Sequence, residues 1–430
     1  MYLLVWVLFI ASALYADGHY DFYVDGIYYN ILESNTEVEV TDSYYNTYGK
    51  PYGAPAIHIP ETVEYMKRTF VVTAIGKEAF MCVNGRANTC NGVYLPKTIK
   101  RIGEKAFYCF YLYSIELPDC LETIGEDAFA GTKLSSITIP SSVKEIGIGA
   151  FRGIDNLTSI QVEEGNSFYD SRNNCNAIVE TKTNTIIAGC TNTIIPSNII
   201  HCANWAFSYS QFEDISLPNS IKTLGAWCFS DCSKLKHLDI PNSVTTIDAH
   251  AFDNCKEIES IKLPQDITLI NEGTFHNCKQ LKSIEIPLSV ESIGNKCFAY
   301  CTSLQKIVIP DGVKSIGELA FDGCSELTEI TVCSLMPCAI KTNTFTDLQF
   351  KLSTLYVPIG TIDKYKNKSY WNKFKYIVEY GPTSSIKMLE TNRIDSGKYY
   401  DINGRLLQIP KKGLNITTSR DRMPKKVIVR

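Results

Sequence analysis

Apolar residues recur along most of the chain in a frame of 22 or 23 residues anchored on proline. Around Pro241, apolar or small side chains fall six, three and one residues before the proline and three, six, ten, eleven and fourteen residues after it. The same frame fits around Pro264 and Pro310, and degenerate coils fit in which Glu163 or Cys333 takes the proline slot. A fixed period in this range predicts a solenoid, in which each coil buries its apolar side only against its neighbours.

The frame also predicts the local structure of each coil, with slots numbered from the proline. The β-branched stretch before the proline predicts a strand with its apolar face inward. The proline ends that strand because it has no N–H to donate. The Ala-Phe pair at slots +10 and +11 should fill the coil centre, with phenylalanine stacked on phenylalanine. Slot +7 holds Gly103, Gly125, Gly147, Gly225, Gly294 and Gly317, or Asp248 and Asn271. Because these residue types tolerate positive φ, we expect a sharp corner there.

The repeated motif resembles a known family. As it stands in SIEIPLSVESIGNKCFAYCTSL (residues 283–304), it is similar to the BspA-like leucine-rich repeats, which occur on surface proteins of anaerobic bacteria. The resemblance and the frame together imply a mainly β solenoid of about thirteen coils of 22–23 residues. We expect an N-terminal β cap, one hairpin insertion and a small C-terminal β tail in addition.

The N-terminal part divides into a leader and a cap. Residues 1–16 form a short apolar run ending in small residues, which predicts a signal peptide. A membrane anchor would need about 20 apolar residues, so we expect no transmembrane helix after signal removal. Residues 17–71, with two alternating runs, resemble the family's N-terminal cap and first coil. A cap is needed because the first coil would otherwise expose its apolar edge.

The C-terminal part of the chain ends the solenoid, which we assign to residues 72–380, and adds a tail. Residues 348–380 resemble the family's closing coil, with Tyr365, Trp371 and Phe374 covering the last coil. Residues 381–430 predict a linker and short strands around Asn403–Gly404 and Lys412–Gly413.

The tail resembles the sorting segments of type IX secretion cargo. The matching parts are Tyr400–Arg405, Gly413-Leu414 and the terminal Lys425–Arg430. The resemblance implies export machinery as a partner through residues 381–430 and a Gram-negative source. A small β module that caps the solenoid is the alternative.

Composition limits both the domain organisation and the class of partner. With 45% apolar residues, the chain has ample material for a core, and the period favours one long solenoid over several globular domains. The formal net charge of −4 argues against nucleic acid as a partner, because that binding needs a basic face.

The sixteen cysteines favour packing over a disulfide framework. Five of them, from Cys232 to Cys324, share slot +14, where other coils carry residues such as Phe110, Thr132 or Ile154. A slot that accepts these types is a packing site, in which cysteine acts as a small apolar residue. No cysteine spacing predicts a metal site.

One coil departs from the period. Residues 163–196 are about ten residues too long, and two alternating runs flank a turn at residues 181–184. We expect a projecting β-hairpin that pairs Val179 near Ile186 and sets Cys175 opposite Cys190. Two alternatives follow for these cysteines: they form a disulfide, or both are buried free thiols.

No catalytic motif appears in the chain, and no cofactor is expected. The six histidines share no frame, and neither a nucleophile elbow nor a phosphate-binding glycine loop is present. Two regions could bind a partner. The outward slots −2 and −4 hold Glu116, Thr138, Ser216, His237, Asp239, Lys262, Glu285 and Lys306, a mixed face without an aromatic stripe. Asp239, Lys262 and Glu285 should form a stabilising ladder of opposite charges. The hairpin coil adds Asp170, Ser171, Arg172 and Asn173, or serves only to fix coil geometry.

These observations predict an exported protein, at the cell surface or secreted, that acts as a binding or adhesion scaffold. Its ligand would be a protein or glycan of a host or of another bacterial surface. The alternatives are an enzyme or enzyme-associated module with a site on the solenoid face, and a purely structural surface component.

Overall fold

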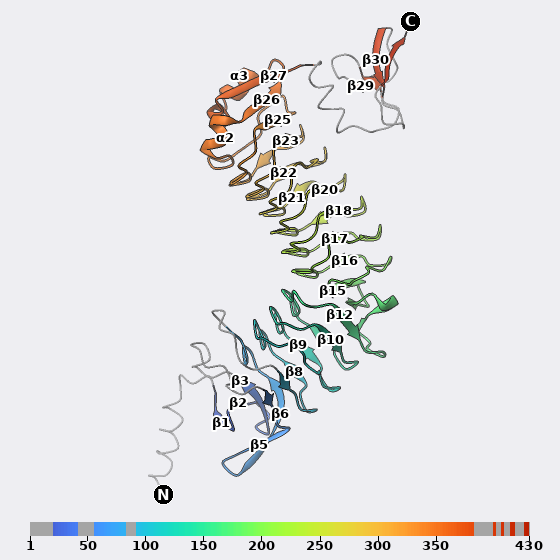
Figure 1. The fold of residues 1–430 in the computed structure, drawn as a ribbon, viewed down its shortest axis with the longest axis vertical. Helices are drawn as coiled ribbons and strands as arrows, with labels where there is room; N and C mark the ends of the chain where they lie inside the picture. Colours follow the sequence, from blue (N-terminus) through green and yellow to red (C-terminus); the bar gives the residue numbers. More distant parts are fainter. Residues whose placement is uncertain are drawn as a thin grey trace. The chain divides into compact units, whose positions relative to one another are not determined.

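The computed structural model describes residues 20–41, 56–82 and 92–381, and the backbone of four short strands between residues 399 and 429. The chain is a β-solenoid of about thirteen turns with almost no helix (Figure 1). It divides into two compact units. The first comprises Met1–Ile267 with Asn271–Gln280, and the second comprises Thr268–Ile270 with Leu281–Arg430.

The first unit begins with a small antiparallel sheet that joins the solenoid. Three strands pair in succession, and the third pairs in parallel with a long strand that continues into the coils. The buried rings of Phe22 and Tyr29 stack 5.3 Å apart beneath this sheet, which covers the apolar edge of the first coil. The strands are β1 (Phe22–Val24), β2 (Ile27–Ile31), β3 (Glu37–Thr41), β5 (Thr62–Tyr65) and β6 (Arg68–Ile75).

The coils contribute one or two short strands each, and these strands pair in parallel with the same slot of a neighbouring coil. Before the proline lie β4 (Ile57–His58), β7 (Val93–Tyr94), β10 (Ser136–Ile139), β12 (Ser159–Val162), β18 (His237–Asp239), β20 (Ser260–Lys262), β23 (Lys306–Ile309) and β25 (Glu329–Val332). At slots +5 and +6 lie β8 (Arg101–Ile102), β9 (Thr123–Ile124), β11 (Glu145–Ile146), β16 (His201–Cys202), β17 (Thr223–Leu224), β19 (Thr246–Ile247), β21 (Leu269–Ile270), β22 (Ser292–Ile293) and β24 (Ser315–Ile316). The frame predicts the first set, whereas the second was not expected.

The strand before the proline is absent from four of the coils that were expected to carry one. Residues 114–117, 192–195, 215–217 and 283–286 form no assigned strand, although Leu217, Ile284 and Ile286 still bury their side chains. Burial of the inward residues therefore persists where the strand ladder does not.

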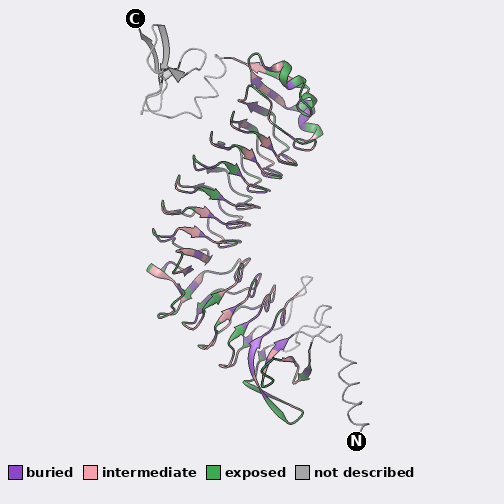
Figure 2. Cartoon of the chain, turned by 180° about the vertical axis from the view of Figure 1, so that it is seen from behind, coloured by how far each residue is buried: buried purple, intermediate pink, exposed green. Residues whose placement is uncertain are grey.

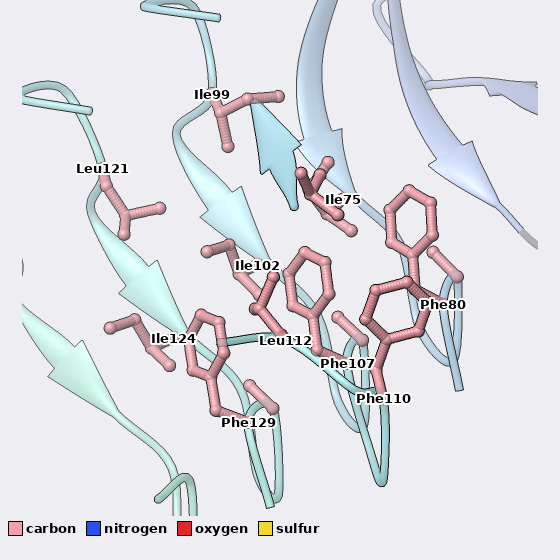
Figure 3. Packing of buried hydrophobic residues seen from close by; sticks show 14 of the residues in the cluster. Ile75, Phe80, Ile99, Ile102, Phe107, Phe110, Leu112, Leu121, Ile124 and Phe129 are labelled. Atoms are coloured by element: carbon pink, nitrogen blue, oxygen red, sulfur yellow. The ribbon is translucent and has the colours of Figure 1, made fainter. Parts of the chain in front are cut away.

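Phenylalanine columns fill the coil centres, as the slot +11 pattern predicts. In the first unit the rings of Phe80, Phe107, Phe129 and Phe151 stack nearly parallel at 5.2, 5.3 and 5.5 Å between centroids. Figure 3 shows the first three of these rings in one column. The rings of Phe207, Phe229, Phe252 and Phe275 stack in the same way, and those of Phe298, Phe321 and Phe345 do so in the second unit. Stacked rings combine the burial of large apolar side chains with favourable aromatic contact.

Cysteines at slot +14 line the columns and also donate hydrogen bonds. Cys232 Sγ lies 3.1 Å from the carbonyl oxygen of Phe207, and Cys255 Sγ lies 3.1 Å from that of Phe229 in the preceding coil. The same contact joins Cys324 to Phe298 at 3.0 Å. The slot therefore packs a small side chain, as expected, and also supplies a weak donor to a buried carbonyl.

We expected a sharp corner at slot +7 because its residue types tolerate positive φ, and this reason is wrong. None of the slot's glycines has positive φ. Instead, a Cβ on Gly125 would lie 2.5 Å from the backbone nitrogen of Glu104, and one on Gly147 would lie 2.3 Å from that of Glu126. At these two positions glycine is needed because the backbones of successive coils approach closely, not because of the φ angle.

Left-handed backbone occurs instead at slots +9 and +13. Trp205, Trp227 and His250 at slot +9 have φ of 65°, 60° and 59°, and Tyr209 at slot +13 has φ of 64°. Each such residue costs about 1–3 kcal/mol. The conformation turns alternate amides toward the next coil: Trp205 N–H donates to Ala226 O at 3.0 Å, and Tyr209 N–H donates to Ser230 O at 2.9 Å. This ladder of hydrogen bonds offsets the strain.

The second unit ends in a closing segment that covers its last coil. Tyr365, Trp371 and Phe374 are buried, as predicted, and Phe374 meets the ring of Phe345 edge-on at 5.2 Å. Helix α2 starts with a capping box between Thr346 and Gln349. The elements are α2 (Asp347–Leu352), β26 (Thr354–Pro358), α3 (Ile362–Lys366), the 3₁₀ turn η3 (Trp371–Lys373) and β27 (Tyr376–Tyr380).

Part of the sequence-based interpretation lies outside the described residues. This holds for the signal peptide assigned to residues 1–16. In the tail, β28 (Tyr399–Tyr400) pairs antiparallel with β29 (Leu406–Leu407) across the Asn403–Gly404 position. β30 (Gly413–Thr417) pairs with β28 and with β31 (Lys425–Val429).

Candidate functional site

The outward residues at slots −2 and −4 of successive coils, just before the proline, form what we call the pre-proline face. All eight predicted face residues are exposed. Six lie in the first unit (Glu116, Thr138, Ser216, His237, Asp239 and Lys262), and two lie in the second (Glu285 and Lys306). Their exposure follows from strand alternation, because Leu238 and Ile261 between them are buried.

The parallel register brings members of this face together in pairs. Asp239 lies directly opposite Lys262 between β18 and β20, although their side chains form no ion pair. His237 Nδ1 lies 3.0 Å from Ser260 Oγ on the same two strands. In the second unit Lys306 lies opposite Glu329. At Asp239 and Lys262 the expected alternation of charge is thus present as juxtaposition across neighbouring strands rather than as a bonded pair.

The insertion at residues 163–196 is a hairpin with the expected turn. Strand β14 (Ala177–Glu180) pairs antiparallel with β15 (Thr185–Gly189), and Val179 lies opposite Ile186. The short strand β13 (Tyr169–Asp170) and the 3₁₀ turn η2 (Arg172–Asn174) lead into it.

Three of the four predicted hairpin-site residues are committed to internal contacts. The Arg172 guanidinium donates to both carboxylate oxygens of Asp170 at 2.7–3.1 Å and to Asn184 Oδ1 at 2.7 Å. Ser171 Oγ donates to Ala177 O at 2.8 Å and accepts from Val162 N–H at 3.0 Å. Asn173 is exposed with φ of 58°. This geometry favours the reading in which these residues hold the coil in shape.

Cys175 and Cys190 are free, buried thiols, the second of the two alternatives. Each sulfur points to a backbone oxygen rather than to the other sulfur. Cys175 Sγ lies 3.8 Å from Ala177 O, and Cys190 Sγ lies 3.4 Å from Asn176 O. Burial raises the pKa of both thiols, which keeps them protonated and unreactive.

A stack of aromatic and cationic side chains lies at the left-handed slots, and the sequence frame did not reveal it. The indole rings of Trp205 and Trp227 stack at 4.8 Å, and the His250 ring stacks on Trp227 at 3.9 Å. On the other side the Arg152 guanidinium lies over Trp205 at 4.7 Å and over Tyr108 at 5.6 Å. Because the stacked faces cover one another, the stack consolidates the coils rather than offering open rings to a ligand.

Carboxylates fix both ends of this stack. Asp127 accepts two hydrogen bonds from Arg152, at 2.6 and 2.8 Å. Asp253 lies between His250 and His276, with Nδ1 contacts of 2.9 and 2.8 Å. Gly153 N–H also donates to Ser208 Oγ at 3.3 Å. The coils that flank the hairpin insertion therefore contact each other directly at this turn.

A known family of repeats matches the repeated part of this chain. The model of the BspA type leucine rich repeat region matches in six copies over residues 73–188, 185–266 and 246–376. The chain belongs to this BspA-type repeat family. The sequence features that indicated this family are the repeated proline, phenylalanine and cysteine positions from Pro96 to Cys324, and these lie inside the matched residues.

Solved structures of other proteins show the same fold. A leucine-rich repeat protein from Eubacterium ventriosum superposes with a TM-score of 0.57 at 19% identity, covering 71% of this chain and 88% of that one. The pneumococcal vaccine antigen PcpA superposes with a TM-score of 0.59 at 22% identity, covering 84% of this chain and 98% of that one. The search of curated proteins found no match.

Within residues 20–41, 56–82 and 92–381, no three His, Cys, Asp or Glu side chains converge in an arrangement that would hold a metal ion. Nor does any helix in the described part of the chain have the length and apolar character needed to span a bilayer.

Proposed function

We propose that this protein is exported and acts at the cell surface, or after secretion, as a scaffold that binds a protein or a glycan. The ligand would belong to a host or to another bacterial surface. The apolar run of residues 1–16 and the tail at residues 381–430, with its resemblance to sorting segments, support export from a Gram-negative cell. Residues 381–430 would then engage the export machinery.

The pre-proline face supports a binding role. Parallel strands in register carry side chains such as His237 and Asp239 on one coil and Ser260 and Lys262 on the next, all exposed and mounted on a stacked backbone. A surface fixed in this way meets a ligand with little loss of side-chain and backbone freedom on binding. Repeat proteins use extended faces of this kind to bind partners.

We propose binding rather than catalysis. Asp170 and Arg172 pair with each other, and Asp253 is held between two histidines. The groups with potential acid–base chemistry thus serve the coil structure. This proposal rests on the pre-proline face, whose residues combine exposure with a regular arrangement.

The binding test compares two triple variants in a screen against host matrix proteins and glycans. His237→Ala/Asp239→Ala/Lys262→Ala removes three members of the pre-proline face. Lys222→Ala/Thr245→Ala/Thr246→Ala removes exposed side chains at slots +4 and +5 of neighbouring coils. We expect the first variant to weaken binding of any ligand found by about tenfold or more, roughly 1.4 kcal/mol, and the second to retain it. Equal affinity of the two variants would contradict a role for this face.

The localisation test fractionates cells that express the chain with and without residues 381–430. We expect the full chain in the outer-membrane or extracellular fraction and the truncated chain inside the cell envelope. Surface display of the truncated chain would remove the sorting role of the tail.

A further inference from the structure

The closing segment differs sharply in charge from the rest of the chain. Residues 1–340 contain 24 Lys and Arg against 39 Asp and Glu, whereas residues 341–380 contain seven lysines against three carboxylates. All seven lysines are exposed. They are Lys341, Lys351, Lys364, Lys366, Lys368, Lys373 and Lys375. The segment that ends an acidic solenoid is therefore strongly basic.

None of these lysines has a carboxylate partner in the described part of the chain, whereas several lysines of the coils do. Lys144 pairs with Glu122 at 2.9 Å, and Lys236 pairs with Glu213 at 3.0 Å, in each case across one coil. Among the described residues, none of the seven lysines of the closing segment forms an ion pair. With seven lysines against three carboxylates, the segment keeps a net positive charge, so an external anion would lower the energy of this surface.

Helix α2 adds apolar side chains to the same surface. Leu348, Lys351 and Leu352 are spaced at i, i+3 and i+4, which places them on one face of the helix. The two leucines are 55% and 62% exposed, while Gln349 and Phe350 are buried. Figure 2 shows exposed residues concentrated on the helices of this closing segment.

Two further lysines flank this helix. Lys373 Nζ lies 5.4 Å from the centre of the Phe350 ring and 5.7 Å from that of Tyr370. Lys375 N–H donates to Phe350 O at 2.8 Å, which fixes the backbone of Lys375 beside α2. We call Leu348, Lys351, Leu352, Tyr370, Lys373 and Lys375 the α2 patch.

We propose that the α2 patch docks the protein onto an anionic lipid surface. The ammonium groups would pair with lipid phosphates, and the two leucines would enter the boundary between headgroups and acyl chains, while the lysine stems extend along them. A soluble polyanionic glycan would satisfy the lysines but leave the leucines in water. The combination of exposed leucines with unpaired lysines therefore favours lipid. This inference is independent of the ligand on the pre-proline face.

The test measures partition of the full chain onto vesicles of phosphatidylcholine, alone and mixed with phosphatidylglycerol. We expect binding to the anionic vesicles that weakens as salt increases. Lys351→Gln/Lys373→Gln/Lys375→Gln should weaken it by about fivefold per lysine, or about 100-fold in total. The matched control Lys144→Gln/Lys236→Gln/Lys314→Gln makes the same change in net charge at lysines that pair within the coils, and it should stay close to the wild type.

A second variant separates lipid from glycan. Leu348→Ser/Leu352→Ser keeps every charge, so it should lose binding to anionic vesicles while it still binds dextran sulfate as the wild type does. Wild-type affinity of this variant for vesicles would instead identify a polyanion site and overturn the lipid assignment. Absence of vesicle binding by the wild type, or equal binding to neutral vesicles, would also overturn it. Unchanged tryptophan fluorescence, to which the buried Trp371 contributes, verifies that each variant is folded.

Discussion

Replacing Gly147 by alanine should destabilise the solenoid, although most glycine-to-alanine changes outside turns stabilise a protein. A Cβ at this position would lie 2.3 Å from Glu126 N and 2.6 Å from Gly125 C, both backbone atoms of the preceding coil. Ordinary contact begins near 3.4 Å, so the two coils would have to separate by about 1 Å. Backbone atoms cannot rotate away as a side chain would.

The magnitude follows from what such a separation breaks. Gly147 N–H donates to Ile124 O at 2.8 Å, and this bond would be lost. A lost hydrogen bond costs about 1 kcal/mol, and overpacking costs about 1–3 kcal/mol. The reduced freedom of the unfolded chain returns about 0.4–1 kcal/mol. We therefore expect Gly147→Ala to lower the free energy of unfolding by about 2 kcal/mol.

The assay is equilibrium urea unfolding followed by tryptophan fluorescence, with a control from the same slot. Ala203 occupies slot +7 in its own coil, so Ala203→Gly should cost only about 0.5–1 kcal/mol through backbone entropy. If Gly147→Ala is as stable as the wild type or more stable, the close approach of successive coils is not what requires glycine.

Three further predictions test other parts of the coil. Phe252→Ala should cost about 3–5 kcal/mol of unfolding free energy because its ring is buried between two others, and a loss under about 1 kcal/mol would mean that the column is not packed. Burial raises the pKa of the Cys324 thiol to about 12, so iodoacetamide at pH 8 should alkylate it only in denaturant; rapid labelling of native protein, read by mass spectrometry, would contradict its burial. Asp127→Asn should lower the free energy of unfolding by about 2–3 kcal/mol, since it leaves the partly buried Arg152 without its carboxylate. Tryptophan fluorescence should also change, because the guanidinium over Trp205 shifts. An unaltered emission spectrum and an unaltered unfolding midpoint would refute this coupling of Asp127, Arg152 and Trp205.

The sequence alone predicted the features that repeat with a uniform residue type. Proline, phenylalanine and cysteine each keep one slot, and periodic side chains of that kind must meet when coils stack. The burial of the closing residues Tyr365, Trp371 and Phe374 could be predicted because residues 348–380 resemble the family's closing coil.

The features that sequence reasoning missed have no uniform residue type. Slot +9 holds Trp205, Trp227 and His250 at positive φ, where bulky residues give no turn signal. The only hint was glycine in the same slot at Gly149 and Gly273. The glycines of slot +7 were misassigned because glycine serves both positive φ and close backbone approach, and only coordinates distinguish the two.

The candidate site could likewise be predicted only where it follows from the repeat. Exposure of the pre-proline face could be foreseen from strand alternation, since outward slots follow from inward ones. The pairing of Asp170 with Arg172 could not, because it depends on how η2 turns the backbone. Nor did the frame indicate the basic character of α2 and its neighbours, which lie beyond the last regular repeat.

The register of neighbouring coils is tested most directly by disulfide cross-linking on the pre-proline face. Asp239→Cys/Lys262→Cys places two cysteines on directly opposed residues, where neighbouring strands lie about 4.8 Å apart, within disulfide reach. His237→Cys/Lys262→Cys places them on a diagonal of about 8 Å, out of reach. We predict that mild oxidation joins the first pair and not the second, as mapped by mass spectrometry. Cross-linking of the diagonal pair in preference to the opposed pair would contradict the stacking on which the proposed binding face depends.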